Sequence, residues 1–123
     1  MKWLREKKRV RKAADRANAA LDQLAEQTRQ LWPSDLKSAY EKLAGASGGN
    51  DPPPKLSEQV RPVKRADDDA WRARMDAEKT FDEAERQLST SMAREGCRKA
   101  IYSWEVHEKA IRLAERLIPS PQA

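Results

Sequence analysis

The chain has 123 residues, of which 37% are charged and 38% are hydrophobic, and its formal net charge is +5. Runs of strand-forming residues are absent, so the composition favours an all-α protein and excludes sandwiches, barrels and doubly wound sheets. No stretch approaches the roughly 20 consecutive apolar residues that a membrane span needs, and no signal peptide is recognisable, so the sequence predicts a soluble cytoplasmic protein.

The first predicted element is a long helix over residues 1–32. Apolar residues recur along it from Trp3 to Leu31 with alternating spacings of four and three. This spacing places a narrow apolar stripe on one side of the helix and is typical of a coiled-coil seam, which a partner helix must cover. The middle of the stripe is rich in alanine, so the partner backbone can approach closely. The expected seam residues of this helix are Val10, Ala14, Ala17, Leu21, Leu24 and Leu31.

Two short segments follow. Pro33 has no amide hydrogen and disfavours helical geometry at the residue before it, so the first helix should end here. Apolar residues at helical spacing predict a short second helix over 34–45, with Gly45 as its stop. Residues 46–65 hold four of the seven prolines, and the Gly- and Pro-rich part up to Lys55 shows no apolar periodicity, which predicts a loop in which residues 56–63 could form one turn of helix.

The last predicted element is a long helix over 67–118. It opens with Asp67, Asp68 and Asp69, whose carboxylates suit the positive end of a helix dipole. The heptad phase changes near Ser89 to Gly96, where helix propensity is weak, yet no Pro, Asn-Gly or Gly-rich turn marks a reversal. We therefore expect one continuous helix; a break at Ser89 to Gly96 would instead give a four-helix bundle. The expected seam residues of this element are Phe81, Leu88, Ala100, Trp104, Ile111 and Ala114.

Together these elements predict a single helical domain over residues 1–123. Its architecture would be an elongated, antiparallel, coiled-coil-like helical hairpin, in which the first two helices lie along the last one. Such a rod has a large surface relative to its core. We therefore expect it to form a homo-oligomer or to bind another helical protein.

Positive charge is concentrated at the N-terminal end, because the first twelve residues contain seven cations and one anion. Such an end can contact nucleic-acid phosphates, an anionic membrane surface or an acidic partner, or it can be a solvated helix end. The chain lacks helix-turn-helix spacing and zinc-finger ligands, so any nucleic-acid binding should be non-specific and salt-sensitive. The candidate contact residues are Lys2, Arg5, Lys7, Lys8, Arg9, Arg11 and Lys12.

Residues suited to catalysis or metal binding are few. The single cysteine, Cys97, and the single histidine, His107, exclude an internal disulfide and a Cys/His zinc site, and about 15 Å of helix separates them. The Glu-x-x-His motif of di-iron bundles fails because Trp104 stands three residues before the histidine. We therefore expect no catalytic residue, metal or cofactor. The sequence predicts a non-enzymatic protein-protein interaction or scaffolding module, with a non-specific nucleic-acid-binding protein that uses the basic N-terminal end as the alternative.

Overall fold

The computed structural model describes residues 2–45 and 52–119. Within these ranges the chain forms four helices and no strand: α1 (Lys2–Gln30), α2 (Ser34–Leu43), α3 (Pro54–Gln87) and α4 (Thr90–Glu115). The prediction of an all-α fold is confirmed. Across the described part of the chain, no helix combines the length and the hydropathy that a membrane span requires.

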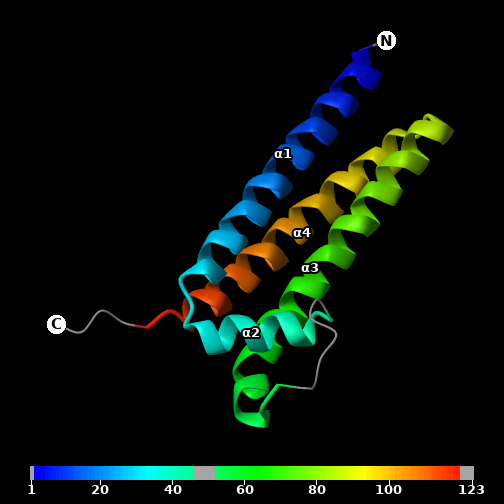
Figure 1. Ribbon diagram of the computed structural model, residues 1–123. Coiled ribbons are helices and arrows are strands. Elements are labelled where there is room, and N and C mark those ends of the chain that lie inside the picture. The colour runs from blue at the N-terminus through cyan, green and yellow to red at the C-terminus, as the bar shows by residue number, and fades with distance from the viewer. Residues whose placement is uncertain (1, 46–51, 120–123) are drawn as a thin grey trace.

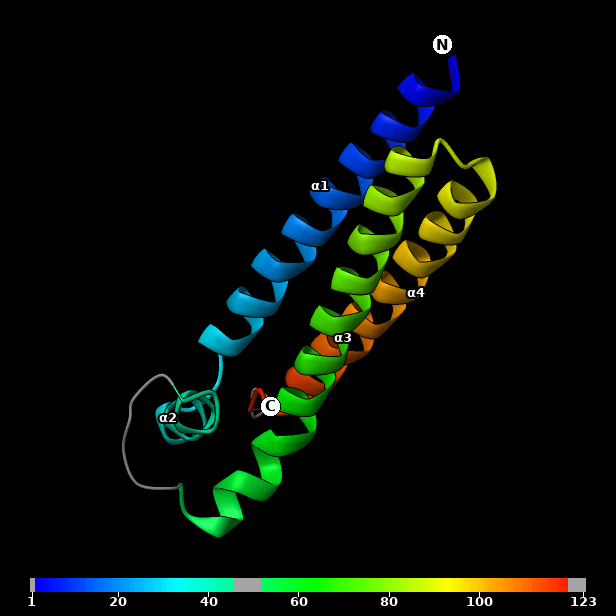
Figure 2. The same cartoon turned by 90° about the vertical axis from the view of Figure 1, so that its right-hand side faces the viewer.

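The central unit of the fold is an antiparallel hairpin of α3 and α4 (Figure 1). α1 runs alongside this hairpin, parallel to α4, and packs mainly on α4 and only lightly on α3. α2 turns away from the direction of α1 and packs against the first part of α3 (Figure 2). The chain is therefore an elongated helical bundle with a short helix across one end.

The prediction of one continuous helix over 67–118 is wrong, because the chain reverses at Leu88 and Ser89. Leu88 adopts the left-handed conformation, with φ 52° and ψ 40°, and ends α3. Ser89 then caps α4, since its Oγ accepts a hydrogen bond of 3.3 Å from the amide of Met92. The left-handed position usually belongs to glycine or asparagine, so a leucine there gave no reversal signal.

The predicted loop over 46–65 is also wrong for its second half, because α3 begins at Pro54. Residues 46–51 lie outside the described part. A proline suits the first helical position, where an amide hydrogen has no partner within the helix. Pro62 interrupts the hydrogen-bond ladder further along, but Val60 and Val63 beside it are both buried. Their burial compensates for the lost hydrogen bond and keeps the segment helical.

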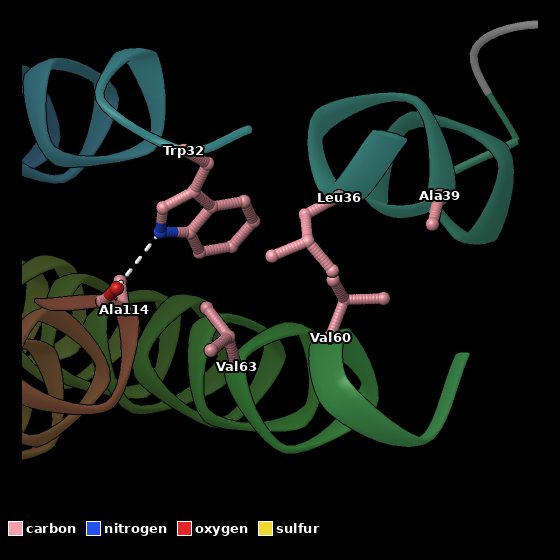
Figure 3. Close-up of a cluster of buried hydrophobic side chains, with 6 residues drawn as sticks. All are labelled: Trp32, Leu36, Ala39, Val60, Val63 and Ala114. Carbon is pink, nitrogen blue, oxygen red and sulfur yellow. Dashed lines mark hydrogen bonds between the residues drawn. The ribbon is translucent and has the colours of Figure 1, made fainter. Parts of the chain in front are cut away.

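The buried apolar side chains form two clusters. The lower cluster joins the corner between α1 and α2 to the end of α4: the indole Nε1 of Trp32 donates a hydrogen bond of 2.8 Å to the carbonyl oxygen of Ala114 (Figure 3). Its buried members are Trp32, Leu36, Ala39, Val60, Val63 and Ala114. The upper cluster lies between α1, α3 and α4 and comprises Ala14, Ala77, Phe81 and Ala100.

Gly96 is a point of close approach in the upper part of the hairpin. A Cβ atom at this position would lie 2.8 Å from Cδ1 of Phe81, well inside van der Waals contact. The missing side chain lets α4 lie directly on the phenylalanine ring. Gly96 is therefore a packing residue within α4 and does not break the helix.

Candidate interaction surface

The predicted seam of the first helix is only half covered by the fold. Ala14 is buried, and Ala17 and Leu21 are partly buried. Val10, Leu24 and Leu31 are exposed, the last two by 46% and 63%. As contacts within one chain, these three predictions are wrong.

Most of the predicted seam residues of the last element are buried. Phe81, Ala100, Ile111 and Ala114 are buried, and Trp104 is partly buried. Leu88 is exposed, because it forms the left-handed turn at the end of the hairpin. The predicted apolar face of the C-terminal half therefore packs as expected everywhere except at the reversal.

The seam on α1 divides because two neighbouring heptad stripes run along this helix. The inner stripe faces the bundle and is buried or half-buried throughout; it comprises Arg11, Ala14, Asn18, Leu21, Ala25 and Thr28. The outer stripe is exposed except for Ala17; it comprises Val10, Ala13, Ala17, Ala20, Leu24, Gln27 and Leu31. Each outer residue from Val10 to Gln27 precedes an inner one, and successive residues are 100° apart around a helix. The predicted seam took alternate members from both stripes.

Polar contacts account for this rotation of α1. Arg11 lies 2.6 Å from Asp82, and Asp22 lies 2.5 Å from Arg74, so ion pairs join α1 to α3 at two levels. On the inner stripe the hydroxyl of Thr28 donates a 2.7 Å hydrogen bond to a carbonyl oxygen one turn earlier. These contacts turn a partly polar stripe inward and leave the more apolar outer stripe in solvent.

The sequence predicted that the acidic triplet at residues 67–69 begins a helix. This prediction is wrong, because the triplet lies in the middle of α3. Asp67 joins three helices there. It accepts a hydrogen bond from the hydroxyl of Tyr40 and lies 3.5 Å from Nη1 of Arg29, whose guanidinium stacks over the Tyr40 ring. Burial raises the pKa of Asp67, and the bonds from Tyr40 and Arg29 oppose that rise. This cluster fixes the lower ends of α1 and α2 on α3.

Ile101 extends the exposed apolar surface from α1 onto α4. Cys97 and Trp104 of α4 pack against the upper cluster, to which α1 contributes Ala14. Ile101 comes four residues after Cys97 and three before Trp104, so it lies on the same side of α4 as these two residues. It is 51% exposed. We call the outer stripe of α1 together with Ile101 the outer face.

The basic N-terminal end of α1 reaches beyond the turn between α3 and α4 (Figures 1 and 2). Arg11 is bound to Asp82, as described above. Lys8, Arg9 and Lys12 are exposed, and none of them forms an ion pair with another described side chain. The side chains of Lys2, Arg5 and Lys7 lie outside the described part of the structure.

A polar layer separates the two apolar clusters. On α4, His107 lies midway between Ala100 of the upper cluster and Ala114 of the lower one, and its Nε2 is buried without a hydrogen-bond partner. Burial lowers the pKa of His107, and Asp22 opposes this effect. Oδ1 of Asn18 is likewise buried and unpartnered. The described residues bring together no group of three or more side chains suited to a metal ion.

Comparisons with protein-family models, with curated protein sequences and with solved structures found no match to this chain.

Proposed function

We propose that the protein is a non-enzymatic protein-binding module whose outer face receives a partner helix. The supporting observation is that the folded chain still exposes an apolar stripe with heptad spacing. Val10, Ala17, Leu24 and Leu31 follow one another at intervals of seven residues, and only Ala17 is partly buried. A stripe of this period matches the contacts that one helix makes along another.

The alanines of the outer stripe determine how the partner approaches. Ala13, Ala17 and Ala20 have side chains that project little, so a second backbone can lie close to α1 over this segment. Ile101 on α4 supplies a large apolar contact beside them. The outer face thus has small side chains at its centre and larger residues toward both ends of α1.

Two neighbouring alanines provide a matched test. Ala20 lies on the outer stripe, whereas Ala19 is equally exposed but lies 100° around the helix. Glutamate at either site has the same charge and helix propensity. In Ala20→Glu the carboxylate would be buried under the partner, at a cost of roughly 2 kcal/mol or more, which is at least a 30-fold loss of affinity.

The assay is capture of partners from native lysate on the immobilised full chain, followed by their identification and by quantitative binding with the purified partner. We expect wild type and Ala19→Glu to bind alike and Ala20→Glu to lose the interaction, while circular dichroism shows equal helix content. Equal binding by both glutamate variants would refute the proposal.

A second candidate function, non-specific binding of a polyanion such as nucleic acid, is supported by the basic end of α1. Lys8, Arg9 and Lys12 are exposed and outside the ion pairs described, at an end that projects from the bundle. Cations in this arrangement release counterions when they contact phosphates, so binding should weaken steeply with salt.

The test replaces Lys8, Arg9 and Lys12 together by glutamine. For duplex DNA we expect the slope of log K against log salt to fall by about 3, because three phosphate contacts are lost. The control replaces three exposed cations of α3, Arg61, Arg65 and Lys79, and so removes the same charge elsewhere. If the control variant lowers this slope as much, then net charge, and not the N-terminal end, accounts for the DNA binding.

A further inference from the structure

We propose that the partner of the outer face is a second copy of this chain, packed antiparallel to the first. This inference rests on the proposed protein-binding function and names its partner. Charge, shape and exposed area each support it.

Charge selects the antiparallel direction. A parallel pair would place two N-terminal ends side by side, each with seven cations and one anion in twelve residues. An antiparallel pair separates these ends. Repulsion between these like-charged ends favours the antiparallel orientation.

The outer stripe also fits itself in the antiparallel direction. In the register that pairs the part of the stripe from Val10 to Gln27 with itself, Ala17 of each copy lies opposite Ala20 of the other. One layer further out, Ala13 lies opposite Leu24, and the next layer pairs Val10 with Gln27. The alanine pairs at the centre allow close backbone approach, and the outer layers pair a small side chain with a larger one, as interdigitated helices require.

Ile101 lies beside the upper part of this alanine segment. Trp32 contacts Ala114 at the lower end of the bundle, and Ala14 shares a cluster with Ala100 at the upper end. Between these two levels, Ile101 lies beside the segment of α1 from Ala13 to Ala20. Its exposed side chain therefore lies where α1 itself has only alanines, and it can fill the space beside the partner helix.

The exposed area is large enough for such an interface. The chain exposes 8553 Å², whereas a compact protein of 14.0 kDa exposes about 6,700 Å². The difference is about twice the roughly 800 Å² that each partner buries in a typical stable interface. Pairing along α1 would remove part of this excess without any change in the fold.

Disulfide trapping tests the direction and the register. In a Cys97→Ser background, Ala13→Cys and Leu24→Cys are prepared separately. We expect the mixed variants to form a cross-linked heterodimer, whereas each variant alone stays uncross-linked, because like positions are about 16 Å apart along the helix and disulfide Cβ atoms are about 4 Å apart. Cross-linking of each variant with itself would overturn the antiparallel arrangement.

Sedimentation equilibrium of the full chain tests the association itself. We expect dimers for wild type and Ala19→Glu, and at least a tenfold weaker association for Ala20→Glu and for Leu24→Gln, with unchanged helix content. A wild-type chain that stays monomeric at all concentrations would overturn the proposed dimer. The proposed protein-binding function would still stand if Ala20→Glu loses binding to a different partner captured from lysate. If Ala19→Glu and Ala20→Glu behave alike in both assays, the proposed function fails as well.

Discussion

Replacement of Gly96 by alanine tests how tightly α4 packs on α3. On an open helix face this change stabilises a protein by up to about 1 kcal/mol, because glycine loses more backbone freedom on folding. Here the new Cβ would lie 2.8, 2.9 and 3.2 Å from three atoms of the Phe81 ring, which is itself only 2% exposed. Overpacking of this kind costs about 1–3 kcal/mol. We therefore expect Gly96→Ala to lower the free energy of unfolding by about 1 kcal/mol.

A double-mutant cycle with Phe81→Leu isolates the contact. Leucine has no Cε1 atom and its Cδ atoms can rotate away from the new Cβ, so Gly96→Ala should now stabilise the chain by up to about 1 kcal/mol relative to Phe81→Leu alone. The coupling free energy between the two sites is then about 2 kcal/mol, and urea unfolding followed by circular dichroism measures it. If Gly96→Ala stabilises the wild-type chain as much as it stabilises the Phe81→Leu chain, the packing argument is refuted.

Three further predictions concern other parts of the fold. Leu88→Gly should raise the free energy of unfolding by about 0.5–1 kcal/mol, since glycine adopts the left-handed turn without strain and the leucine is mostly exposed; a lower denaturation midpoint would contradict this. Trp32→Phe should lower the free energy of unfolding by about 1–3 kcal/mol, because the carbonyl oxygen of Ala114 loses its indole donor. An unchanged denaturation midpoint would show that this hydrogen bond contributes nothing to stability. His107 is buried with a lowered pKa, so the unfolded chain takes up its proton first, and stability should fall as the pH drops below the ordinary value of 6.5. His107→Gln should flatten this part of the pH profile of urea midpoints; a profile with the original slope would assign the effect to other groups.

The sequence predicted the helical class correctly because three of the four helices carry apolar residues at clear helical spacing. It favoured a continuous helix at the reversal after α3 and held the four-helix bundle only as the alternative, since Leu88 occupies a position where the signal is normally a glycine. It also missed the beginning of α3, because four prolines outweighed the apolar spacing around Val60 and Val63. A helical wheel contains no information about such tertiary compensation.

The rotation of α1 was missed for a different reason. An analysis of periodicity assigns apolar residues to the core. The buried inner stripe, however, contains the polar residues Asn18 and Thr28, and ion pairs hold α1 on α3. Partners 38 to 71 residues away in the chain help to decide which of two adjacent stripes is buried. The residues of the outer stripe were identified in part, but their exposure could only come from the three-dimensional arrangement.

The dependence of α1 on α4 has a consequence for biosynthesis. α4 ends at Glu115, so about 85 residues must be translated after α1 before its packing surface is complete. At roughly 5–20 residues per second this takes about 4–17 s. Throughout that interval both stripes of α1 are uncovered on the nascent chain. Neighbouring ribosomes on one message thus hold first helices close together before either has a hairpin to pack on, and chain pairing can begin during translation.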